Sequence, residues 1–199
     1  MKAFIVTLVL FFTTVTVLGQ SFMHGAGLTI FVVSPRNGDV SFGEGFTYFP
    51  RFNFVETEAL SLSAGIPLTV GLTVTSSLYY SSNGGYSDDG SVGFVVNAPF
   101  IINLNIGRGS TMDNTDKMGY FVGGGYGFHH GDFIMMETDS YGYTNEVFKS
   151  TNIYGPAANA GFRIGVGRKH RNIEVRFSYM KGMNENKPDI FGGGALFNF

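Results

Sequence analysis

The side chains best suited to acid–base or metal chemistry in this sequence are its four histidines, because the chain contains no cysteine. His129 and His130 are adjacent, so in an extended strand their rings point to opposite faces and cannot share a metal ion. His24 lies near the start of the first predicted strand, and His170 lies in a short basic turn. The glycine-rich segment 123–127 precedes no predicted helix, so it does not indicate a phosphate loop. The sequence therefore predicts no catalytic residue, no metal site and no bound cofactor.

Four charged side chains fall at positions whose neighbours of the same parity are mostly small or polar, and they are Arg51, Arg163, Glu174 and Arg176. Residues of one parity share one face of a strand. If that face is the interior, each charge is costly unless it is paired. We therefore expect Glu174 to bridge one or more of the arginines. A structural cluster of ion pairs is the favoured interpretation, and a charged filter for transport is the alternative.

The first residues have the composition of a secretory signal peptide. Lys2 supplies a positive charge, the residues after it are mostly apolar, and Val17 and Gly19 are small enough for cleavage after Gly19. A membrane-anchoring helix is the alternative, but the apolar stretch is shorter than the ~20 residues that a span needs. We expect residues 1–19 to be a signal peptide and residues 20–199 to form one domain.

The rest of the chain is a series of segments in which apolar residues alternate with small or polar ones, as in strands with two different faces. In residues 60–75 every even position is Leu, Ala, Ile or Val, and every odd position is Ser, Gly, Pro or Thr. The predicted strands cover residues 22–33, 45–55, 60–75, 91–106, 118–128, 153–167, 173–179 and 190–199. About eight strands result, an even number that can close an up-and-down barrel.

The two faces of these strands favour a barrel in a membrane over a barrel in water. Charged residues are 14% of the chain, against about 25% in soluble domains. A soluble barrel such as a lipocalin would present Lys, Glu and Asp outward, whereas the non-apolar face here is mostly Gly, Ser, Thr and Asn. Tyrosines accompany the apolar face, as in interfacial girdles: Tyr48, Tyr79, Tyr80, Tyr120, Tyr126, Tyr154 and Tyr179. The predicted fold class is all-β, a transmembrane antiparallel up-and-down β-barrel with a narrow lumen.

Two connections and two prolines within the strands add three local expectations. Residues 81–90 are rich in Gly, Ser and Asp and are predicted to be a loop. Residues 107–117 form a turn that is longer than the inner turns of membrane barrels usually are. A break or bulge is expected near Pro67 or Pro50, because proline inside a closed sheet interrupts the ladder.

The last strand ends on Phe197 and Phe199, and this apolar edge would favour aggregation unless it paired with the first strand. The leader, the alternating strands and the terminal aromatic residue resemble the small outer-membrane β-barrel proteins of Gram-negative bacteria, the OmpA/OmpX-like barrels. The resemblance covers residues 20–199. It implies export to the cell outer membrane, contact with outer-membrane lipid, and recognition of Phe199 by the barrel assembly machinery. Members differ in role, so the fold does not fix the function.

An enzymatic role is disfavoured. A lipid A deacylase of the small-barrel kind needs a histidine, a serine and an acidic group that meet at the outer rim. No serine follows two residues after His129 or His130. We therefore expect the protein not to be an enzyme.

The long connection, residues 129–151, is where we expect a partner to bind, since loops of more than ~15 residues are uncommon unless functional or disordered. Apolar residues on both limbs predict that two strands continue past the membrane as a hairpin that turns near residues 140–145. The candidate contact residues are Phe133, Met135, Tyr141 and Tyr143. The alternative is a hairpin that packs over the barrel mouth.

Two functions remain open from the sequence. The first is a non-catalytic outer-membrane barrel that contributes to envelope structure or contacts an extracellular protein or surface through its loops. The second is a narrow pore for small solutes. Nucleic acid is an unsuitable partner, because the formal net charge is −2 and the chain has no basic excess.

Overall fold

A computed structural model describes residues 21–36, 40–80, 86–138, 144–167, 170–184 and 187–199. Within residues 75–91 and 133–149 it describes the backbone of these residues but not their side chains. The expected signal peptide lies outside the described residues. The strands are β1 (Ser21–Ser34), β2 (Ser41–Glu56), β3 (Leu60–Gly65), β4 (Leu68–Tyr80), β5 (Tyr86–Asn97), β6 (Phe100–Gly107), β7 (Met118–Thr138), β8 (Thr144–Gly165), β9 (Asn172–Lys181) and β10 (Asp189–Asn198). In the described part of the chain, no helix is long and apolar enough to cross a membrane.

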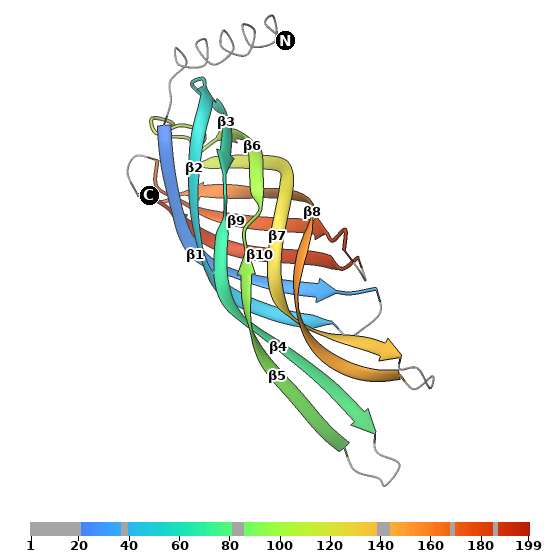
Figure 1. Cartoon of the computed structure of the whole chain (residues 1–199). Helices are drawn as coiled ribbons and strands as arrows, with labels where there is room; N and C mark the ends of the chain where they lie inside the picture. Colours follow the sequence, from blue (N-terminus) through green and yellow to red (C-terminus); the bar gives the residue numbers. More distant parts are fainter. Residues whose placement is uncertain (1–20, 37–39, 81–85, 139–143, 168–169, 185–186) are drawn as a thin grey trace, which may run out of the picture.

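The strands form one antiparallel sheet that closes on itself as a barrel (Figure 1). β1 pairs with β2 along one side and with β10 along the other, where Ala26 lies opposite Phe197. Further round the barrel, β7 pairs with β6 and β8. Because the first strand pairs with the last, the apolar final strand has no free edge. The predicted fold, a transmembrane up-and-down β-barrel, is confirmed.

The ten strand segments correspond to about eight crossings of the barrel wall, because two long strands are each interrupted at a proline. β3 and β4 are separated by Ile66 and Pro67, and β5 and β6 by Ala98 and Pro99. Pro50 stays inside β2, where it pairs with β1 and faces the gap between β3 and β4. The expected break at Pro67 is therefore confirmed, and the break at Pro99 was not predicted.

Burial alternates along the strands with the predicted parity. The even positions of β1 point outward, and Leu28 and Ile30 are 68% and 61% exposed. Five of the predicted girdle tyrosines also point outward, and they are Tyr48, Tyr120, Tyr126, Tyr154 and Tyr179. The side chains of Tyr79 and Tyr80 lie outside the described residues. A wall that exposes apolar side chains in this way suits contact with lipid rather than water.

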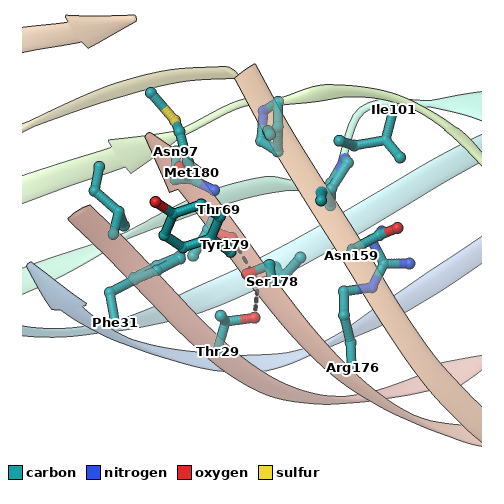
Figure 2. Close-up of a pocket in the computed structure, with 16 residues that line it drawn as sticks. Thr29, Phe31, Thr69, Asn97, Ile101, Asn159, Arg176, Ser178, Tyr179 and Met180 are labelled. Atoms are coloured by element: carbon teal, nitrogen blue, oxygen red, sulfur yellow. Dashed lines mark hydrogen bonds between the residues drawn. The ribbon is translucent and has the colours of Figure 1, made fainter. Parts of the chain in front are cut away.

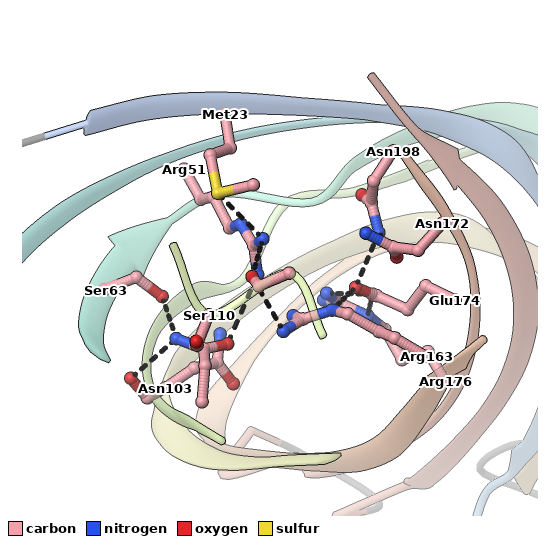
Figure 3. Close-up of polar contacts among 12 residues, drawn as sticks. Met23, Arg51, Ser63, Asn103, Ser110, Arg163, Asn172, Glu174, Arg176 and Asn198 are labelled. Atoms are coloured by element: carbon pink, nitrogen blue, oxygen red, sulfur yellow. Dashed lines mark hydrogen bonds and ion pairs between the residues drawn. The ribbon is translucent and has the colours of Figure 1, made fainter. Parts of the chain in front are cut away.

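The sequence predicts a lumen lined by small and polar side chains, and the structure differs from this prediction in one half of the lumen. Its charged half, which contains Arg51, Arg163, Glu174 and Arg176 (Figure 3), lies where β2 and β8 end and where β1 and β9 begin. The other half is filled by an apolar cluster of Phe31, Val33, Ile101, Ile153, Ala157, Met180 and Ile190. The alternation could not reveal this cluster, because β1 is apolar on both faces near residues 30–33.

Two connections are shorter than predicted because their strands are longer. β5 begins at Tyr86, so the prediction of a loop over residues 81–90 is wrong for residues 86–90. The β7–β8 ladder continues to Thr138 opposite Thr144, which confirms the predicted path of a hairpin beyond the wall. The turn of that hairpin, residues 139–143, lies outside the described residues.

Candidate functional site

Glu174 holds two arginines by ion pairs inside the lumen (Figure 3). It lies opposite Arg163 in the β8–β9 ladder, and Arg176 follows two residues later on the same face of β9. Glu174 Oε2 lies 2.7 Å from Arg163 Nε, and Glu174 Oε1 lies 2.6 Å from Arg176 Nη2. Arg163 and Glu174 are completely buried. The strand register thus places two guanidinium groups on one carboxylate, one at each oxygen.

Arg51 belongs to the same buried layer but does not bond to Glu174. Its Nη1 donates to Asn105 Oδ1 at 3.2 Å, and its Nη2 donates to the Gly109 carbonyl oxygen and lies 3.1 Å from Met23 Sδ. Of the four charged residues that the sequence places inward, the structure therefore brings three into direct contact and holds the fourth by neutral acceptors.

Aromatic rings complete the surroundings of these arginines. The guanidinium carbon of Arg176 lies 4.1 Å from the ring centre of Phe49, and that of Arg163 lies 4.5 Å from the ring centre of Phe121. Cations over ring faces are stabilised by the negative face of the aromatic quadrupole. Phe49 and Phe121 point inward, so these rings also occupy the space that a conducting lumen would need.

The turn between β6 and β7, residues 107–117, folds into the barrel and closes its mouth. The Gly109 carbonyl oxygen accepts hydrogen bonds from Arg51 and Arg163. The Ser110 carbonyl oxygen accepts hydrogen bonds from Asn53 Nδ2 at 2.8 Å and from Ser61 Oγ at 2.6 Å. The sequence signalled an unusually long turn, but a turn has no periodicity that could show which way it folds.

Above the charged layer the lumen contains a small cavity of about 30 Å³ (Figure 2). Three threonines on β1, β2 and β4 form a ladder of hydroxyl groups on its wall, with 2.7 Å between Thr29 and Thr47 and between Thr47 and Thr69. Arg176 and Asn159 line the cavity from β9 and β8. The cavity is thus polar on the side of the charges and apolar toward Phe31.

The histidines occupy separate places. His129 points inward, is completely buried and has its Nδ1 3.2 Å from Asn97 Oδ1. His130 points outward, and His24 stands at the opposite end of the barrel with its Nδ1 2.5 Å from the Tyr48 hydroxyl oxygen. Among the described residues, no group of three or more His, Asp or Glu side chains could hold a metal ion.

His130 meets two polar side chains of β8 that the sequence reasoning did not consider. Its Nδ1 lies 2.8 Å from Asn152 Oδ1, and its Nε2 lies 3.4 Å from Ser150 Oγ. A serine beside a histidine that a third group orients is the geometry of an activated nucleophile. Acyl transfer also needs a pocket and donors for an oxyanion, and the cavities described in the structure lie in the lumen and beside Glu44, away from these exposed residues.

The C-terminal residue completes the seam between β10 and β1. The Phe199 backbone N–H donates to the His24 carbonyl oxygen at 3.0 Å. The Phe199 ring stacks on the ring of His24, with 6.0 Å between centres, and on that of Phe197, with 6.3 Å. Phe197 and Phe199 both face outward. The residues proposed as the assembly signal are therefore accessible on the outer wall at the end of the last strand.

The β7–β8 hairpin continues beyond the last residues at which β7 and β8 contact their other neighbours. β7 last pairs with β5 at His130, and the segment after β9 last bonds to β8 at Asn152, where Asn184 Nδ2 donates to the Asn152 carbonyl oxygen. The hairpin ladder itself continues to Thr138 and Thr144. Of the four predicted contact residues, Phe133 and Met135 lie on this part of β7, where the structure describes only the backbone. Tyr141 and Tyr143 lie outside the described residues.

Comparison with known proteins bears on the fold. No protein-family model matches the chain, and no curated protein matches it in sequence. The crystal structure of Ail, the attachment invasion locus protein of Yersinia pestis, aligns with a TM-score of 0.55 and 13% identity over 92% of this chain and 99% of that chain. Neisserial surface protein A aligns at a TM-score of 0.47, 12% identity, and 90% and 97% of the two chains. The likeness to Ail shows that this chain has the fold of a small outer-membrane β-barrel.

Proposed function

We propose that the protein is a non-catalytic integral outer-membrane β-barrel that contacts an extracellular protein or surface through its β7–β8 hairpin. The observation that carries this proposal is the length of the hairpin beyond the barrel wall. Ail is named for attachment and invasion, but that name describes Ail, and at this level of identity the likeness concerns the fold alone. The argument for contact therefore rests on the hairpin.

In the described part of the chain, no further strand pairing to either edge of the hairpin is found beyond His130 on β7 or before Asn152 on β8. The two strands stay paired from Gly131 opposite Thr151 to Thr138 opposite Thr144. Figure 1 shows them leaving the barrel together, away from the chain ends. An unpaired strand edge offers a row of backbone donors and acceptors to another chain. The hairpin therefore has the means for contact by strand addition.

The alternative, a narrow pore, is disfavoured by what fills the lumen. The buried ion pairs of Glu174, the rings of Phe49 and Phe121 and the inward turn 107–117 occupy the half of the lumen near that turn. The apolar cluster occupies the other half. Barrels of about eight strands leave room only for side chains. These features support a barrel that anchors a surface element rather than one that conducts.

The proposal is tested by shortening the hairpin. Residues 134–148 are replaced by a short Gly/Ser turn, and the protein is displayed on whole cells. We expect the barrel to keep its heat-modifiable gel mobility, because these residues lie beyond the last neighbours of β7 and β8, while binding of the cells to immobilised matrix proteins and glycans is lost. A matched control shortens the β4–β5 hairpin by replacing residues 77–89, and it should retain the binding.

Two results would contradict the proposal. If the variant shortened at residues 134–148 does not fold, the hairpin is part of the barrel's own stability. If it folds and binds as well as the full-length protein, contact is made elsewhere. Loss of binding in the β4–β5 control but not in the β7–β8 variant would assign the contact to the other hairpin.

A further inference from the structure

The lumen contains more buried positive charge than buried negative charge. Among the described residues, the buried charged side chains are Arg51, Arg108, Arg163, Arg176 and Glu174. Arg108 donates to the Arg171 carbonyl oxygen at 2.9 Å, which satisfies hydrogen bonds but adds no negative charge. Glu56 is only half-buried and bonds to Ser21 and Asn53 at the mouth of the barrel. A buried charge without a counter-charge is costly, so an additional anion bound in this interior would stabilise the folded barrel.

The cavity beside Arg176 has unsatisfied groups that could bind one. Arg176 and Asn159 are each 5% exposed. Arg176 Nη1 and both polar side-chain atoms of Asn159 are buried, and none of them has a hydrogen-bond partner among the described residues. In the β8–β9 ladder Asn159 lies opposite Ser178, and Arg176 lies opposite Gly161. The two side chains are therefore diagonal neighbours on the inner face, and both line the cavity (Figure 2).

We propose that this cavity binds one monatomic anion of the halide class, held between Arg176 Nη1 and Asn159 Nδ2. The cavity volume of about 30 Å³ is room for about two water molecules, so a monatomic anion such as chloride fits in it. Water could accept the same hydrogen bonds but could not offset the charge of the arginines. Neutral and cationic ligands are disfavoured for the same reason.

The surroundings of the cavity determine how such an anion would enter. Phe31, Met180 and Ile190 line its apolar side, and the ion pairs of Glu174 lie on the other. The turn 107–117 closes the mouth beyond those ion pairs. An anion that is present during folding can therefore enter before the barrel closes. The experiments below accordingly refold the protein in the salt to be tested. The proposal does not depend on the surface contact made by the hairpin.

The first test locates the anion. The full chain without its leader is refolded and crystallised in sodium bromide, and anomalous scattering is measured at the bromine edge. We expect a peak within hydrogen-bond distance of Arg176 Nη1 and Asn159 Nδ2. The absence of a peak in the lumen would overturn the proposal and leave the cavity to water only.

The second test measures linkage in solution. The protein is refolded in detergent micelles with gluconate replaced stepwise by chloride at constant ionic strength, and the urea unfolding midpoint is measured. An anion bound only to the folded state raises the folding equilibrium constant about 100-fold at a concentration 100 times its dissociation constant. We expect the midpoint to rise with chloride. A midpoint that is independent of chloride up to physiological concentrations, even with a bromide peak, means binding at crystal concentration only and overturns the proposal.

A substitution ties the effect to the cavity. Asn159→Asp places a carboxylate beside Arg176 and supplies the missing charge, so the dependence on chloride should disappear. Asn152→Asp makes the same change at an exposed outer position of β8 and should leave it intact. If Asn159→Asp does not fold, Asn159→Ala removes one of the two anion ligands and should weaken the dependence. Retention of the full chloride effect in either cavity variant would overturn the proposal.

Discussion

Glu174 is the residue whose loss should cost the barrel most, because it holds Arg163 and Arg176 inside the lumen. Glu174→Ala would leave both guanidinium groups buried without their partner. Removal of one member of a buried pair costs about 3 to 5 kcal/mol, so we expect a large fall in the urea midpoint of the refolded protein. Glu44→Ala, at an exposed position of β2, is the matched control and should change little. An unchanged midpoint for Glu174→Ala would show that water reaches the cluster and would favour the pore.

The inward turn, residues 107–117, depends on Gly109. Its φ is +71°, and an added Cβ would lie 2.7 Å from Asn172 Nδ2 and 3.0 Å from Arg163 Cδ. Gly167 has the same φ, but an added Cβ there would meet nothing within 4 Å. A left-handed conformation costs an L-residue roughly 1 to 2 kcal/mol. Gly167→Ala should lose about that much, and Gly109→Ala should lose more because it also crowds the arginine layer.

Equilibrium unfolding of the two alanine variants in the same detergent measures this difference. Equal losses would mean that the turn moves away from Arg163 without cost and does not close the mouth tightly. Neither glycine could be assigned this role from the sequence, since both lie in polar turns and only the path of the backbone distinguishes them.

At the scale of the strands, parity predicted the inward positions of Arg51, Arg163 and Glu174 because the two faces of those strands differ in polarity. The same reasoning missed the apolar layer at Phe31, where both faces are apolar. It also missed Arg108, which lies in a turn without periodicity. The Pro99 break follows from the same rule that identified Pro67, but which ladder a proline interrupts depends on pairing between strands that are distant in the sequence.

The last strand should determine assembly. Phe199 contributes a backbone hydrogen bond to His24 and stacks on Phe197 at the seam. Deletion of Phe199 removes this closing contact and the outward aromatic residue that we expect the assembly machinery to recognise. We expect the truncated protein to be missing from the outer membrane fraction and to be degraded or aggregated in the periplasm, as measured by immunoblots of cell fractions.

Two controls separate recognition from stability in that experiment. The truncated protein is also refolded from urea into detergent, where no assembly machinery acts. If it folds there but does not reach the membrane, recognition has been lost. Normal membrane levels of the truncated protein would contradict the role given to Phe199.

At the scale of the whole molecule, the inward turn, the charged cluster and the apolar cluster fill most of the lumen, and the hairpins extend from this filled barrel. Closure between β1 and β10 removes the free edges of the wall, while the β7–β8 hairpin keeps its edges open beyond it. Strand edges are therefore unpaired at the point where β7 and β8 extend past the wall. In an architecture of this kind, sequence changes in the hairpin can alter contacts without disturbing the closed barrel.

Conductance tests this view of the lumen directly. The purified barrel is inserted into planar lipid bilayers, and current is recorded under an applied potential. We expect no discrete conductance steps, because Phe49 and Phe121 fill the lumen beside the ion pairs and Phe31 and Ile101 fill it above them. A variant in which Phe31 and Ile101 are both changed to Ala serves as the control: it thins the apolar layer, yet the ion pairs should still block current. Discrete steps from the unmodified protein would show a continuous water path and would favour the pore over a support for the hairpins.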